Sequence, residues 1–183
     1  AIRDAMLAVS GELDLSRPEA SLVGRVIGDR PISLIGLDKR LPKDLDGSVH
    51  RSVYLPVIRD RLPDVLELFD FASSSFVTGA RENTNVPTQA LYLMNSPFVQ
   101  DRAASLAKRV RERTGDDTNA GIRYVFQLCC GREPEPDEAA NAAEFLLADS
   151  QSVDEGNGES EEADALTRFC QAILCTAEFR NLD

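Results

Sequence analysis

Side chains that make directional polar contacts are concentrated between residues 51 and 95. Arginine presents a rigid fork of N–H donors that suits carboxylates, sulfates and clustered sugar hydroxyls. This stretch combines such arginines with an aspartate and several hydroxyl and amide side chains, so it predicts a polar pocket for an anionic or hydroxylated ligand. We call these residues the 51–95 polar set: Arg51, Tyr54, Arg59, Asp70, Arg81, Thr84, Thr88, Gln89 and Asn95.

The same residues also fit a purely structural network. In that interpretation Arg81 pairs with Asp70, while Thr88 and Asn95 cap helix ends. Asp70 lies between two phenylalanines, and its carboxylate would need a partner if it turned inward. We expect an Asp70–Arg81 ion pair to hold residues 71–86 against the helix that follows. The sequence leaves the choice between a ligand site and a structural network open.

Independent catalysis has weak support. General acid–base chemistry needs two positioned groups, and the spacing of Asp60, Asp70 and Glu82 marks no pair. A Ser-His-Asp system would have to use His50, the only histidine, yet the G-x-S-x-G turn is absent. Glycine loops that bind phosphate are absent too. The sequence therefore favours a non-catalytic role over an independent enzyme.

The four cysteines do not have the spacing of a metal site. They form neither a C-x-x-C pair nor a C-x-x-C-H haem signature, and a single histidine excludes most zinc arrangements that use imidazole. We therefore expect no metal and no cofactor in this chain. The thiols fit buried, small apolar side chains, or one disulfide between two helices. They are Cys129, Cys130, Cys170 and Cys175.

Negative charge is concentrated in the last third of the chain. The net charge is -11, and residues 115–183 contain 4 Lys and Arg against 16 Asp and Glu. These acids predict a solvated surface that repels phosphate groups, so nucleic acid and anionic membranes are poor partners. Every uncharged run is far shorter than the roughly 20 apolar residues that span a bilayer. We expect no membrane insertion.

The hydrophobic pattern predicts a single all-α domain over residues 1–183, an irregular or orthogonal bundle. Apolar residues at helical spacing alternate with proline and glycine at the expected helix ends. The expected parts are a helix end at 1–10, a long irregular segment at 11–50 and a helical core at 51–183. That core begins with at most one short extended piece, at 52–58, and contains an acidic loop at 149–164.

Helix boundaries are marked by residues with known capping roles. Ser96 is expected as N-cap and Pro97 as first helical residue, Gly131 as a helix terminator, and Pro136 as another start. The helices expected in the core lie near 63–70, 87–94, 97–113, 119–130, 136–148 and 162–178. The most regular apolar stripe is Phe98, Val99, Ala103, Leu106, Ala107 and Val110.

Several segments resemble the PSD-one domain of planctomycete proteins. The most specific is A-R-E-N-T-N-V-P-T-Q-A-L-Y-L-M-N-S-P-F-V, at residues 80–99, preceded by R-S-V-Y-L-P-V-I-R and L-E-L-F-D-F. The opening A-I-R-D-A-M-L-A-V-S-G and the later L-C-C-G-R-E-P-E-P-D-E and A-I-L-C-T-A-E-F-R-N-L-D also fit, so the resemblance covers nearly the whole chain.

The resemblance implies a C-terminal domain of a large exported, extracytoplasmic multidomain protein. Haem is implied only for upstream domains of such proteins, and no catalytic residue is carried over to this chain. The first hypothesis is a non-catalytic interaction or scaffold domain that packs against its sister domains. The alternative is a substrate-binding or catalytic domain acting on a polymer such as a polysaccharide, with a site around Arg51, Asp70 and Arg81.

Overall fold

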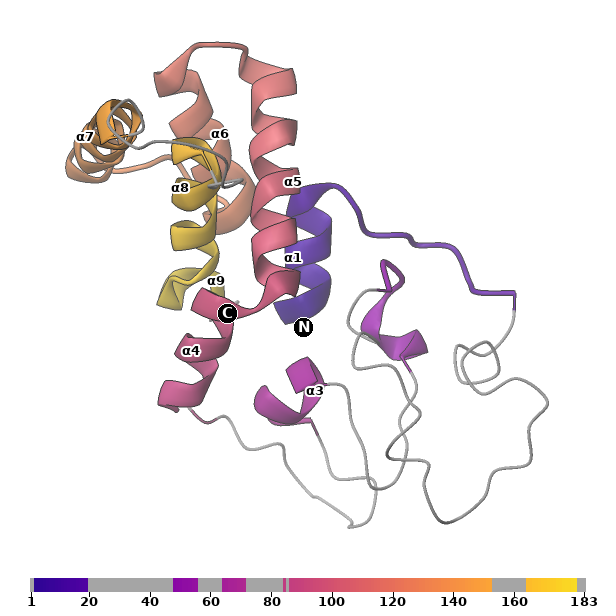
Figure 1. The fold of residues 1–183 in the computed structure, drawn as a ribbon. Coiled ribbons are helices and arrows are strands. Elements are labelled where there is room, and N and C mark those ends of the chain that lie inside the picture. Colours follow the sequence, from indigo (N-terminus) through magenta and orange to yellow (C-terminus); the bar gives the residue numbers. More distant parts are fainter. Residues whose placement is uncertain are drawn as a thin grey trace, which may run out of the picture. The chain divides into compact units, whose positions relative to one another are not determined.

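The expected all-α class is confirmed. A computed structural model describes residues 2–19, 48–55, 64–71, 84, 86–152 and 164–180, with side chains described outside 149–152. Over these residues the chain is built from helices, and its β-type pairing is limited to an isolated bridge between Asp14 and His50 (Figure 1). None of the described helices is long and apolar enough to cross a membrane.

The helices follow the predicted order along the chain. Proline stands at the first position of α4, α5 and α7, where its missing N–H leaves no helical hydrogen bond unmade. The elements are α1 (Ile2–Ser10), the 3-10 turn η3 (Ser52–Tyr54), α3 (Asp64–Leu68), α4 (Pro87–Asn95), α5 (Pro97–Thr114), α6 (Thr118–Cys130), α7 (Pro136–Ser152), α8 (Ala165–Leu174) and α9 (Ala177–Arg180).

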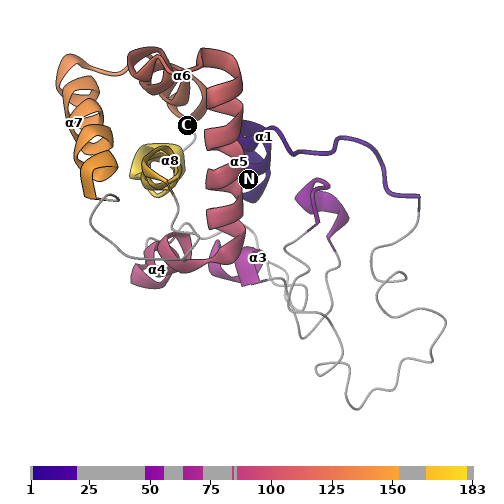
Figure 2. The ribbon, with the colours of Figure 1, turned by 45° about the horizontal axis from the view of Figure 1, so that its top comes forward.

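The chain divides into two compact units. Residues 1–5 and 13–89 form the first, and residues 6–12 and 90–183 form the second. In the second unit α8 makes its most extensive contact with α5 and also packs on α6 and α7. Figure 2 looks along α8 and shows α5, α6 and α7 around it. The amphipathic α8 therefore supplies the centre of this bundle.

Leucine, phenylalanine, valine and alanine make up most of the core of the second unit, and the sequence contains no tryptophan. The predicted stripe on α5 is buried along its whole length, from Phe98 to Val110. Burial of such side chains is the main stabilising contribution, about 25 cal/mol for each Å² of apolar surface. The core also includes Met6, Leu7, Ile122, Val125, Phe126, Phe169, Cys170, Ile173, Leu174 and Phe179.

Local capping fixes the bend between α5 and α6 and the end of α6. The Asp117 carboxylate accepts a hydrogen bond from the backbone N–H of Ala120 at 3.0 Å, which satisfies one of the free donors at the start of α6. Gly131 ends α6 in the left-handed conformation (φ 69°), as expected. Ser96 is the N-cap of α5 by position, but its side chain makes no capping hydrogen bond.

The expected extended piece at 52–58 is wrong over its first part. Residues 52–54 form the turn η3, and residues 56–58 lie outside the described residues. The physical reason is a contact from far along the chain: the Asp4 carboxylate accepts from the backbone N–H of Ser52 at 2.8 Å and from its hydroxyl. A carboxylate at the start of a helical turn accepts from backbone N–H groups that a β-strand would instead donate to an adjacent strand.

Two predicted boundaries near the C-terminal end are also wrong. The single helix expected at 162–178 is divided into α8 and α9, because the Thr176 hydroxyl donates to the Ile173 carbonyl and accepts from the Phe179 N–H. The acidic loop expected from residue 149 begins later, since α7 continues to Ser152. The rest of that loop, 153–163, lies outside the described residues.

Candidate functional site

Three members of the 51–95 polar set lie together in the first unit. Asp70, which follows α3, accepts hydrogen bonds from the backbone N–H of Thr84 at 2.8 Å and from its hydroxyl at 2.9 Å. The Gln89 side chain, only 3% exposed, donates to the Leu68 carbonyl at 3.0 Å and to the Thr84 hydroxyl at 3.5 Å. These bonds join the end of α3 to the segment that leads into α4, so the cluster ties the backbone together.

The other members of the set are divided between several places. Arg51 is exposed just before η3, and Tyr54 is half-buried at its end. Thr88 is exposed in the first turn of α4. Asn95 bonds the Leu91 carbonyl at 2.8 Å and so acts on the last turn of α4, as expected of a capping residue. Arg59 and Arg81 lie outside the described residues, so the proposed Asp70–Arg81 pair stays a prediction.

A second polar cluster in the first unit was not predicted from the sequence. The Arg3 side chain is 1% exposed and donates to the carbonyls of Ser48 and His50 and to the Ser52 hydroxyl. Asp4 lies beside it, with 3.7 Å between Arg3 Nη1 and Asp4 Oδ1. A buried guanidinium that bonds backbone carbonyls fixes a chain segment in place, and no local signal around residue 3 indicates partners more than 40 residues away.

His50 forms the one candidate acid–base pair that the described residues contain. Its Nδ1 lies 3.3 Å from Asp14 Oδ2. Hydrogen bonds from Ser16 hold the pKa of the Asp14 carboxyl below its usual value, so this carboxylate is charged at neutral pH. Ser48 presents its hydroxyl to the backbone N–H of His50, and among the described residues no serine hydroxyl bonds the imidazole. The pair therefore lacks the nucleophile of a catalytic triad.

In the second unit most arginines are held by acceptors. Arg102 lies 2.8 Å from a Glu12 oxygen, and Arg109 donates to the carbonyls of Ala8 and Val9 at 3.0 and 2.8 Å. Arg111 lies 2.7 Å from Asp164, the N-cap of α8. These contacts tie α5 to the end of α1 and to α8, which identifies them as structural.

Arg132 has the most developed of these networks. It bonds both oxygens of Glu138 at 2.7 and 2.8 Å and both oxygens of Glu178 at 2.7 and 2.8 Å. The forked bond to Arg132 and the backbone N–H of Glu135 lower the pKa of Glu138 to about 2. The network holds the loop after α6 to the start of α7 and to α9, so it too is structural.

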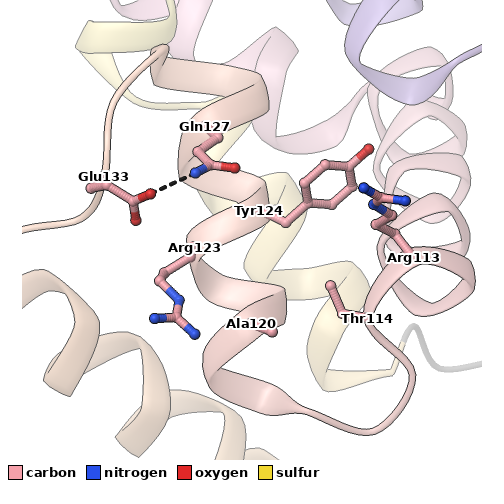
Figure 3. A pocket seen from close by; sticks show the side chains of 7 residues that line it. All are labelled: Arg113, Thr114, Ala120, Arg123, Tyr124, Gln127 and Glu133. Atoms are coloured by element: carbon pink, nitrogen blue, oxygen red, sulfur yellow. Dashed lines mark hydrogen bonds between the residues drawn. The ribbon is translucent and has the colours of Figure 1, made fainter.

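A hollow lined mainly by polar side chains lies where α5 meets α6. Its volume is about 580 Å³, and its polar lining is shown in Figure 3. Tyr124 extends from α6 on the Arg113 side, whereas Arg123 extends on the other side, and the Gln127 amide donates to Glu133 at 2.5 Å. A second hollow of about 360 Å³ adjoins it and shares Arg123 and Glu133. The remaining lining residues of the first hollow are Thr114 and Ala120.

The cysteines have the properties of core residues. All four are free thiols, and Cys129 and Cys170 are buried. Burial raises the pKa of the Cys129 thiol to about 12 and also raises that of the Cys170 thiol. Thiols held protonated in this way are poor nucleophiles and poor metal ligands. Over the described part of the chain, no three His, Cys, Asp or Glu side chains are grouped to hold a metal ion.

The described residues form an all-α domain whose Asp70, Arg3 and Arg132 clusters are bonded within the chain. The model of the family described as PSD1, protein of unknown function (DUF1553), matches residues 1–146. The chain therefore belongs to this family, and the resemblance noted in the sequence is confirmed. No curated protein and no solved structure matches the chain.

Proposed function

We propose that this chain is a non-catalytic interaction domain of a large exported multidomain protein, and that it packs against the sister domains of that protein. Two observations on polar groups support a non-catalytic role. The Asp70 and Arg132 clusters are bonded within the chain, and the His50–Asp14 pair has no adjacent nucleophile among the described residues. Export and the presence of sister domains rest on the family resemblance.

The observation that carries the proposal is an apolar face on α4. Leu91 and Met94 are 58% and 59% exposed, and residues three apart share one face of a helix. The carbonyls of Leu91 and Met94 are themselves bonded by Asn95 and Gln171, so the end of the helix is held in a fixed conformation. Methionine adapts its shape to a partner surface and is common at binding surfaces. A preformed face of this kind suits a protein partner.

The test uses the remainder of the parent protein, produced as a separate polypeptide. We expect the chain to bind it in calorimetric titration, and the double substitution Leu91→Glu with Met94→Glu to abolish the binding. Leu147→Glu on α7 is the control, because Leu147 is 64% exposed and the substitution places a negative charge on an exposed apolar residue of another helix. If the wild-type chain does not bind, or the double variant binds equally well, the proposal is wrong.

The alternative function, a substrate-binding domain, is supported by the hollow between α5 and α6 and not by the 51–95 polar set. The self-bonded Asp70 cluster does not favour it, since the hydrogen-bonding groups of Asp70, Thr84 and Gln89 are already engaged with one another. The hollow between α5 and α6 does favour a ligand.

A further inference from the structure

The hollow between α5 and α6 contains two arginines that differ from the others of the second unit. Among the described residues Arg102, Arg109, Arg111 and Arg132 bond acceptors, and Arg168 and Arg180 also have partners. Arg113 and Arg123 are the two arginines of this described unit without an ion pair or hydrogen bond from the side chain. Both line the same hollow. The two unengaged guanidinium groups extend on opposite sides of the hollow (Figure 3), so each offers its donors to a separate anionic group.

The lack of ion pairs at Arg113 and Arg123 contrasts with the acidic composition of the C-terminal third of the chain. The segment 115–183 contains 16 acidic residues against 4 basic ones, yet among the described residues no carboxylate bonds either arginine. Arg113 also has a simple structural explanation, because a cation in the last turn of α5 interacts favourably with the helix dipole. That explanation does not extend to Arg123, which lies in the first half of α6.

The remaining lining residues restrict the ligand. Tyr124 is half-buried and offers a ring face and a hydroxyl, while Thr114 and Gln127 offer further hydrogen-bonding groups. Glu133 places an acceptor and a negative charge in the same hollow. Such a carboxylate repels a densely charged ligand, for example a polyphosphate or a nucleic acid, but accepts hydrogen bonds from sugar hydroxyls. A ligand with one carboxylate and several hydroxyls satisfies both kinds of group.

We propose that this hollow binds an acidic saccharide with one carboxylate on each sugar ring. Arg113 binds the carboxylate of one sugar and Arg123 binds that of the next, because the two side chains extend on opposite sides of the hollow (Figure 3). The Tyr124 ring lies against a sugar face. Glu133, which accepts the Gln127 amide with Oε1, bonds a sugar hydroxyl with its other oxygen. A volume of about 580 Å³ lies in the usual range for small-ligand sites, roughly 300–1,000 Å³. The adjoining hollow, which shares Arg123 and Glu133, gives room for a second sugar. The site is independent of the α4 face and of the proposed interaction role.

The experiment is a calorimetric or NMR titration of the chain with a short oligogalacturonate. The neutral galactose oligomer with the same linkage, and acetate alone, are titrated in parallel. We expect binding of the oligogalacturonate and much weaker binding of the other two. Arg113→Gln and Arg123→Gln should each weaken binding by about tenfold or more, because each variant loses a charge-assisted hydrogen bond to a carboxylate. Lys108→Gln on α5 is the matched control and should bind as wild type.

Further variants test the two other parts of the site. Tyr124→Ala should weaken binding more than Tyr124→Phe, because the ring face is kept in the latter. Glu133→Gln should weaken binding of the saccharide while strengthening that of sulfate. The proposal is overturned if the oligogalacturonate does not bind in the millimolar range or if both arginine variants bind normally while remaining folded. Equal binding of acetate and the saccharide would reduce the site to a simple anion contact and would overturn the saccharide assignment.

Discussion

The carboxylate of Asp70 bonds both the backbone N–H and the hydroxyl of Thr84, 14 residues further along the chain. Asp70 has φ 56°, so it also provides a left-handed turn directly after α3. Aspartate and asparagine adopt this conformation more readily than most residues. Asp70 therefore has two roles. Its backbone makes the left-handed turn at the end of α3, and its side chain holds the segment that leads into α4.

Substitutions at Asp70 separate these two roles. We expect Asp70→Ala to destabilise most, by about 2 kcal/mol, because it loses the hydrogen bonds and adds left-handed strain of about 1 kcal/mol. Asp70→Gly should lose only the hydrogen bonds, and Asp70→Asn should cost least. The measurement is chemical denaturation. Equal losses for the alanine and glycine variants would show that the left-handed turn is unimportant.

The Asp70–Thr84 contact can be isolated by a double-mutant cycle. Thr84→Val removes the hydroxyl but keeps the backbone N–H, and Asp70→Ala removes the acceptor, so we expect a coupling between them of about 0.5–1 kcal/mol. Thr88→Val is the control, because Thr88 is exposed in the same part of the chain. Additive free energies of unfolding in the Asp70–Thr84 cycle would contradict the contact.

The Arg132 network makes stability depend on pH in the acid range. The pKa of Glu138 is about 2 in the folded chain against an ordinary value of 4.5, so its contribution is complete above pH 4.5 and is lost as the pH falls toward 2. Glu138→Gln should lower the melting temperature by about 2 °C at neutral pH. We expect this difference to shrink as the pH is lowered through that window. Glu144→Gln on α7 is the control, and a pH-independent difference would exclude the charged bond.

Gly121 lies where α6 packs closely against α5. A Cβ atom at this position would lie 3.4 Å from the Val110 Cγ1 atom and 3.6 Å from the Thr114 hydroxyl. Alanine therefore fits and should stabilise by up to about 1 kcal/mol through its higher helix propensity. Isoleucine should destabilise by roughly 1–3 kcal/mol, because its branches must enter occupied space. Thermal melting of both variants tests this, and an isoleucine variant as stable as wild type would refute the close packing.

Native thiol reactivity should divide the cysteines into two pairs. Burial holds the pKa of Cys129 at about 12 and raises that of Cys170 as well, while Cys130 and Cys175 are only half-buried. We expect Cys130 and Cys175 to react first with an aromatic disulfide reagent at mildly alkaline pH, and the buried pair only on unfolding. Cys130→Ser should remove one fast-reacting thiol. Fewer than four thiols after denaturation would instead reveal a disulfide.

Local sequence signals determined most of the helical framework. Pro97, Pro136 and Gly131 act through their own backbone restrictions, and the apolar stripe on α5 has the period of the helix itself. The prediction failed where a side chain redirected the backbone. Thr176 bonds both sides of a break that the apolar pattern passes through, and Asp4 turns residues 52–54 into a helical turn from 48 residues away.

The candidate sites depended on tertiary structure, because their members are far apart in sequence. The types of Arg113 and Arg123 are visible in the sequence, but only the packing of α5 on α6 places them around one hollow. Likewise nothing near residue 3 indicates that its guanidinium bonds the carbonyls of Ser48 and His50. Helix ends are set by backbone geometry within a few residues, whereas a site requires side chains from separate helices to converge, and the sequence alone does not specify that convergence.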